Sequence, residues 1–97
     1  MTDNKITAIF KCLCDLNRLK ILKELGNGEL CACELLDFLD ISQSTLSYHM
    51  KNMVECDLVL VRQVGKWSYY RINKEIFLEF KEYIQNLNFS DLKKSNY

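Results

Sequence analysis

The stretch SQSTLSYHMKNM, residues 42–53, decides the fold. Ser42 is a residue type that favours a helix N-cap, and the residues that follow mark one stripe at helical spacing: Leu46, His49, Met50, Met53 and Val54. A turn of three or four residues separates this helix from a short one expected over residues 33–39. Two helices joined in this way are typical of a helix-turn-helix.

The flanking segments predict the rest of a small, mainly α-helical domain. A first amphipathic helix carries Ile6, Ile9, Phe10, Leu13 and Leu16, and a second begins at an Asp15 cap and ends at a left-handed Gly26. After the helix that ends near Asp57, LVLVRQVGKWSYYRIN (residues 58–73) predicts a two-stranded hairpin turning at residues 64–66. A last amphipathic helix covers residues 75–87. We therefore expect a winged helix-turn-helix with five helices and a two-stranded wing, in a single domain spanning residues 1–97.

The charge and hydrophobicity of the chain limit the classes of function that it can have. The 97 residues carry 13 basic and 13 acidic side chains, so the net charge of zero argues against a generic polyanion binder. Residues 41–73 nevertheless hold four basic and two acidic side chains, which makes the middle of the chain the candidate basic face. With no charged-then-apolar leader and no long apolar run, we expect a cytoplasmic protein that does not enter a membrane.

The helix that begins after Ser42, which we call the reading helix, and the hairpin supply the candidate DNA contacts. Small hydroxyl and amide side chains at a helix start reach base edges and phosphates, and basic side chains neutralise phosphates. The candidates are Ser42, Gln43, Ser44, Thr45, Ser47, Tyr48, His49, Lys51, Arg62 and Lys66. For Ser42 alone, capping is an equal explanation. Because His49 lies on the stripe with Leu46 and Met53, we expect a partly buried structural or phosphate-contacting histidine rather than a metal ligand.

Three motifs in this order, ELCACEL (residues 29–35), SQSTLSYHMKNM and GKWSYYRI (residues 65–72), resemble the ArsR/SmtB family of bacterial metal-responsive repressors. Residues 15–18 resemble the turn between that family's first two helices, although the family commonly has a proline there and this chain has none. The resemblance implies a homodimer built from the first and last helices. It also implies binding to double-stranded operator DNA with an imperfect palindrome, and release when a metal ion binds.

The resemblance implies two possible sensory sites. One family site lies on the last helix and uses His and Asp or Glu, but the only histidine here is His49, so a mixed zinc site is not expected. The other uses a Cys-x-Cys at the start of the third helix, which corresponds to Cys31 and Cys33. Two soft thiolates suit arsenite, antimonite, cadmium, lead or mercury better than a hard cation, so As(III) or Sb(III) is the expected inducer, with Cd(II) or Pb(II) as alternatives.

The spacing of Cys31 and Cys33 sets a geometric condition. Within a helix, residues two apart point about 200° away from each other, whereas in extended backbone they share a face. Cys31 must therefore lie at or before the first turn of the helix. Residues 31–34 also have the spacing of a capping box with a thiol in place of the usual hydroxyl, so we expect a helix start that a thiophilic ion opens easily.

The other cysteines are Cys12, Cys14 and Cys56, and each is expected to pack as a small apolar side chain. Arsenite prefers three sulfurs, and some family members supply a third thiol where this chain has Leu36. The third ligand therefore stays open between Cys12 or Cys14 of a dimer partner, Cys56 and a small-molecule thiol.

Two other function classes remain. The first is a thiol redox sensor on the same scaffold, which would use Cys12, Cys14 or Cys56 as resolving partner because cysteines two apart make a strained bridge. The second is a winged helix that binds protein instead of DNA. An enzyme is not expected, since the sequence shows no acid–base pair around its histidine, no phosphate loop and no nucleophile motif, and hence no catalytic cofactor.

Overall fold

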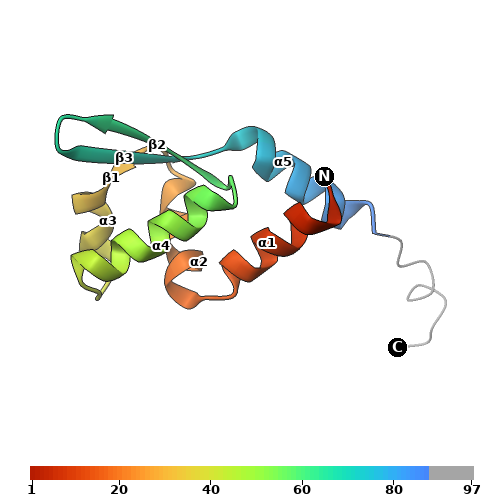
Figure 1. The fold of residues 1–97 in the computed structure, drawn as a ribbon, viewed down its shortest axis with the longest axis horizontal. Helices are drawn as coiled ribbons and strands as arrows, with labels where there is room; N and C mark the ends of the chain where they lie inside the picture. Colours follow the sequence, from red (N-terminus) through yellow and green to blue (C-terminus); the bar gives the residue numbers. More distant parts are fainter. Residues whose placement is uncertain (88–97) are drawn as a thin grey trace.

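A computed structural model describes residues 1–87 and shows five helices and a small sheet in this range (Figure 1). The helices are α1 (Asp3–Leu13), α2 (Leu16–Leu25), α3 (Ala32–Phe38), α4 (Gln43–Glu55) and α5 (Lys74–Gln85). The strands are β1 (Leu30–Cys31), β2 (Val59–Val64) and β3 (Trp67–Ile72). The order of elements confirms the mainly helical, winged helix-turn-helix layout, with α3 and α4 as the helix pair. None of the helices in residues 1–87 is both long and apolar enough to span a bilayer.

The sheet has one strand more than the sequence predicted. Strands β2 and β3 form the expected antiparallel hairpin, which turns at Gly65 with a positive φ of 59°. Strand β1 pairs with the other edge of β3, placing Leu30 opposite Tyr70 and Cys31 opposite Tyr69. Two residues are too few to show the alternation that identifies a strand, so the sequence pattern missed β1.

The core is formed by apolar side chains from every helix and from the start of β2. Its members are Ile6, Ile9, Cys12, Ile21, Leu25, Leu35, Leu39, Leu46, Met50, Met53, Leu58, Val59 and Phe80. Phe10 of α1 lies edge-on to Phe80 of α5, with ring centroids 5.3 Å apart. This contact holds α1 and α5 together at one end of the molecule, while α3 and the wing lie at the other (Figure 1).

One expected helix boundary and one expected helix-end conformation are wrong, although α2 does end at Gly26 as predicted. The first helix ends at Leu13, and Leu16 is a 67% exposed residue of α2. The Asp15 cap explains this, because its carboxylate accepts the backbone N–H of Arg18 at 3.1 Å and starts a new helix. Gly26 is right-handed, since its N–H still bonds to carbonyls in the last turn of α2, and the positive φ of 133° falls at Gly28 instead.

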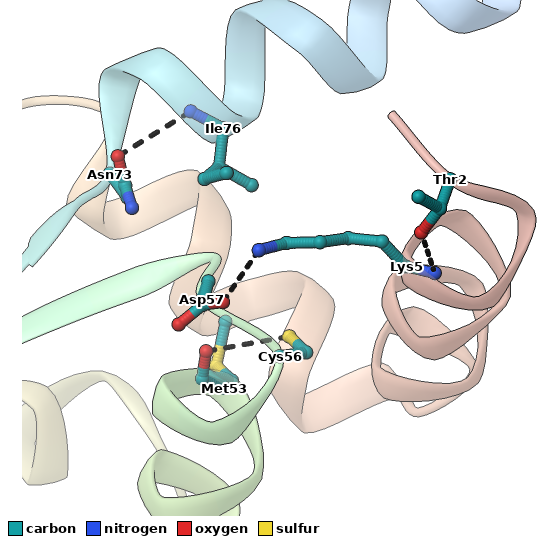
Figure 2. A network of polar contacts seen from close by, with 7 residues as sticks. All are labelled: Thr2, Lys5, Met53, Cys56, Asp57, Asn73 and Ile76. Carbon is teal, nitrogen blue, oxygen red and sulfur yellow. Dashed lines mark hydrogen bonds and ion pairs between the residues drawn. The ribbon is translucent and has the colours of Figure 1, made fainter.

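The end of α4 is fixed by Asp57, which follows the C-cap residue Cys56 and has a positive φ of 65°. Its carboxylate lies 2.7 Å from the ammonium group of Lys5 in α1 (Figure 2). This hydrogen-bonded pair raises the pKa of Lys5. The ion pair ties the start of α1 to the end of α4.

Substitution at Asp57 separates the backbone contribution from the ion pair. Asp57→Gly and Asp57→Ala both remove the carboxylate, but only alanine keeps a Cβ in the left-handed conformation. We expect the alanine variant to be less stable than the glycine variant by about 1 kcal/mol in urea denaturation. Equal stability would show that residue 57 relaxes out of this conformation.

Candidate functional site

The first turn of α4 presents a group of polar side chains. Ser42 caps the helix by accepting the backbone N–H of Thr45 at 3.2 Å, and its hydroxyl also lies within hydrogen-bond distance of the hydroxyls of Ser44 and Thr45. The exposed candidate DNA contacts of this helix are Ser42, Gln43, Ser44, Thr45, Ser47, Tyr48 and Lys51. Capping and exposure thus coexist at Ser42, and these seven predicted contacts lie on the solvent side of α4.

His49 differs from the other predicted DNA contacts because it is only 5% exposed. Its Nδ1 lies 3.0 Å from Nη1 of Arg18, and its Nε2 lies 4.0 Å from the Asp15 carboxylate, both near the start of α2. The structural part of the expectation for His49 therefore holds. Its side chain docks α4 against α2 and does not share the exposed face of α4.

The wing carries two predicted basic contacts with different surroundings. Arg62 of β2 is held by Glu29, with Nη2 to Oε1 at 2.7 Å and Nε to Oε2 at 2.9 Å. This hydrogen-bonded pairing keeps the pKa of Glu29 below its ordinary value. The Arg62 guanidinium also lies 4.5 Å from the ring centroid of Tyr69. Lys66 is exposed at the turn of the hairpin, so it is the better placed of the two for a phosphate.

Cys31 and Cys33 meet the geometric condition set by their spacing. Cys31 is the N-cap of α3 and has extended backbone, with φ −82° and ψ 161°. Its Cα lies 5.4 Å from that of Cys33, and the two sulfurs are in direct contact as a disulfide pair. Glu34 completes the helix start by accepting the backbone N–H of Cys31 at 3.0 Å. The spacing of two residues predicted that a disulfide between Cys31 and Cys33 would be strained. In the structure, the extended backbone at the N-cap brings the two sulfurs together.

A cleft of about 280 Å³ joins the cysteine segment to the DNA-contact candidates. Cys33 lines it from the start of α3, Gln43 and Ser47 line it from α4, and Lys66 and Trp67 line it from the wing. Cys31 is only 7% exposed and is not among the residues that line this cleft, whereas Cys33 is exposed. A ligand at Cys33 would therefore lie beside both the reading helix and the wing.

The remaining cysteines lie elsewhere. Cys12 is buried in the core as expected, but Cys14, at the C-cap of α1, is exposed, so the packing expectation is wrong for Cys14. Cys12 and Cys56 line a separate cleft that shares no residue with the one at Cys33. Residues 1–87 contain no group of three or more His, Cys, Asp or Glu side chains placed to hold a metal ion. In the part of the chain that the structure describes, Cys31 and Cys33 therefore offer two sulfurs as a candidate site.

Comparison with known proteins identifies the family. The family model described as "Bacterial regulatory protein, arsR family" matches residues 12–60, which include α2, α3 and α4. The chain is also 44% identical to an arsenical resistance operon repressor of Staphylococcus aureus, over 91% of this chain and 82% of that protein. The chain belongs to the arsR family. It is thus a DNA-binding transcriptional regulator of the winged helix-turn-helix type, from a family of regulatory proteins rather than enzymes.

Solved structures of similar fold agree with this membership. An ArsR-like transcriptional regulator from Rhodococcus has a TM-score of 0.75 at 26% identity, covering 84% of this arsR-family chain and 77% of that chain. A homodimeric winged helix-turn-helix DNA-binding domain from Mycobacterium bovis has a TM-score of 0.72 at 22% identity. The match covers 100% of this chain and 95% of that chain. The second likeness supports the fold alone. Together they confirm the winged helix-turn-helix arrangement expected from the sequence.

Proposed function

We propose that this chain is a homodimeric repressor that binds operator DNA in the cytoplasm and releases it when arsenite or antimonite binds the reduced thiols of Cys31 and Cys33. Cadmium and lead are the alternative inducers. The observation that carries the proposal is the cleft in which Cys33 lies beside Gln43, Ser47 and Lys66. The Staphylococcus aureus relative, an arsenical resistance operon repressor, supports the same class of inducer. Two thiolates supply soft ligands for these ions.

DNA contact is assigned to the exposed polar face of α4 and to the wing. Gln43 and Ser44 lie in the first turn, from which a reading helix contacts base edges in the major groove. Lys51 and Lys66 are exposed cations that suit phosphates. Arg62 contacts a phosphate only if that phosphate displaces the Glu29 carboxylate from its guanidinium. The buried His49 holds α4 in place through its contacts with Arg18 and Asp15 at the start of α2.

The proposed coupling runs through the N-cap of α3. Cys31 pairs with Tyr69 of β3, and the ring of Tyr69 lies under the guanidinium of Arg62 in the wing. The Glu34 carboxylate holds the Cys31 N–H at the helix start. Any rearrangement of residues 31–34 around an ion therefore changes both the start of α3 and an edge of the sheet. A ligand weakens DNA binding only as far as it prefers this rearranged form.

A third sulfur, if the ion takes one, must come from outside the site. Cys12 is buried and Cys56 is half-buried, so among the other cysteines of residues 1–87 only Cys14 is exposed. We propose Cys14 of a second chain or a small-molecule thiol as the source. Both fit an ion that enters from the exposed side of Cys33.

Dimerisation is assigned to α1 and α5. They leave a group of large apolar side chains exposed at their end of the molecule: Phe10, Leu78, Ile84 and, just beyond α5, Leu87. Exposed apolar surface of this kind marks association sites. The homodimeric state of the Mycobacterium bovis domain is consistent with such pairing.

The test is release of a labelled operator from the reduced protein during separate titrations with arsenite, antimonite, cadmium and lead. We expect arsenite or antimonite to act at the lowest concentration. Release by none of the four ions would overturn the proposed sensory function, while steep loss of DNA binding with salt would still support DNA contact.

The contact between the sulfurs of Cys31 and Cys33 favours a second candidate, a thiol redox sensor that releases DNA when this pair is oxidised. Peroxide titration of the same operator complex separates the two. Release by peroxide without response to any thiophilic ion would support the redox sensor.

Substitutions in α4 and the wing separate base reading from phosphate contact. Gln43→Ala should weaken the operator complex by about 1–3 kcal/mol and relax sequence preference, because an amide that pairs with a base edge is lost. Lys66→Ala should weaken binding to all sequences alike and reduce the salt dependence. Fluorescence anisotropy with operator and scrambled DNA measures both. The opposite pattern would exchange the roles assigned to α4 and the wing.

A further inference from the structure

A second pair of thiols lies between α1 and α4, away from Cys31 and Cys33. Cys12 is in the last turns of α1, and Cys56 is the C-cap of α4, where its thiol donates to the Met53 carbonyl at 3.4 Å (Figure 2). Both line a cleft of about 250 Å³ that also includes Lys11, Arg18 and Glu55. Cys12 is 6% exposed and Cys56 is half-buried. Cys56 is therefore the more accessible of the two thiols that line this cleft.

The charged groups around this cleft distinguish the two thiols. A hydrogen bond from Cys12 lowers the pKa of Cys56 to about 7, against the opposing influences of burial and the Asp57 carboxylate. The same contact raises the pKa of Cys12, as does burial, whereas the nearby Arg18 guanidinium lowers it. Positive charge near the two thiols comes from Lys11 and Arg18, and negative charge comes from Glu55 and Asp15. Lys5 is paired with the Asp57 carboxylate. The accessible sulfur is thus the more readily ionised one, as a reactive cysteine requires.

We propose that Cys56 and Cys12 form a peroxide-reactive pair, in which Cys56 is the attacking thiol and Cys12 is the resolving thiol. The Cys56 thiolate attacks one oxygen of hydrogen peroxide; with one proton taken up, the O–O bond breaks, giving a sulfenic acid on Cys56 and one water. The sulfur of Cys12 then attacks the sulfenic sulfur, its proton leaves with the hydroxyl as a second water, and an S–S bond forms. Peroxide gains two electrons and the two thiols lose two.

The position of this pair gives the reaction a structural consequence. The Lys5–Asp57 ion pair already connects α1 to the residue after Cys56 (Figure 2). A Cys12–Cys56 disulfide adds a covalent link between the C-terminal turn of α1 and the end of the reading helix. In residues 1–87 no third metal-ligating side chain completes a site with these two thiols, so disulfide formation suits the pair better than metal binding.

The test uses the full chain carrying Cys14→Ser, Cys31→Ser and Cys33→Ser, which retains only Cys12 and Cys56 of its five cysteines. Stoichiometric hydrogen peroxide should lower the intact mass by about 2 Da per chain, and peptide mapping should find residues 12 and 56 linked within one chain. No mass loss, oxygen addition without a bridge, or a bridge between two chains would overturn the proposal.

Two further measurements assign the roles. Adding Cys12→Ala should leave a sulfenic acid on Cys56 that a cyclic diketone traps, whereas adding Cys56→Ala should leave Cys12 unreactive; circular dichroism checks that both variants fold. In the variant that retains only Cys12 and Cys56, the oxidation rate should rise about twofold between pH 7 and pH 9, compared with about twenty-five-fold for an ordinary thiol of pKa about 8.5. Trapping on Cys12, or a rise of about twenty-five-fold, would contradict the assignment.

Discussion

Operator complexes of the Cys31→Ser and Cys33→Ser variants should survive arsenite concentrations that release the wild-type protein. Serine keeps the size of the side chain and caps a helix well at position 31, so the fold and operator affinity should be retained. Each variant removes one of the two adjacent sulfurs, and a single thiol holds a thiophilic ion poorly. Coupling between an effector and DNA typically changes affinity by about 5–150-fold, and the variants should lose this whole effect in a release titration.

The matched controls are Ser substitutions at the other cysteines. Cys56→Ser and Cys12→Ser should respond to arsenite normally, because their cleft shares no residue with the one at Cys33. Cys14→Ser should reduce sensitivity without abolishing it if a second chain supplies this sulfur. Normal release by the Cys31 and Cys33 variants would move the sensory site away from α3.

Ile84→Glu should convert the protein into a monomer that binds operator at least about a hundredfold more weakly. Ile84 lies near the end of α5 and is 40% exposed, so a charge there is tolerated by the monomer but not by an apolar interface. Two reading helices held one DNA turn apart gain affinity from joint binding, and a monomer loses this gain. Sedimentation and anisotropy measure the two effects on the same sample.

Gln85→Glu is the control because it adds the same charge at the adjacent exposed residue of α5. It should leave the dimer and operator affinity unchanged. Phe80 is a poor choice for this test, since it is buried against Phe10 and a charge there would disturb folding. A dimeric Ile84→Glu variant with full affinity would place the interface elsewhere.

Local sequence patterns predicted most of the fold. Helical spacing identified α4, the Asp15 cap placed the start of α2, and Gly65 placed the turn of the hairpin. The same reasoning placed Cys31 in extended backbone before α3, which the structure confirms. These features depend on a few neighbouring residues, so the sequence alone was sufficient.

The features that the sequence missed depend on contacts between distant residues. Strand β1 exists because Leu30 and Cys31 pair with β3, and Arg62 meets Glu29 across 33 positions of the chain. The facing of Cys12 and Cys56 depends likewise on how α1 packs against the end of α4. Hydrophobic periodicity indicates which face of a helix is buried but not which partner it meets.

The most direct test of the sensory site is the sulfur environment of bound arsenic, measured by X-ray absorption on the reduced protein with one equivalent of arsenite. We expect at least two sulfur neighbours in the wild-type protein. In the variant carrying both Cys31→Ser and Cys33→Ser, the sulfur shell should be lost and arsenic should remain bound to oxygen only. An unchanged sulfur shell in that variant would contradict the assignment of Cys31 and Cys33 as the site.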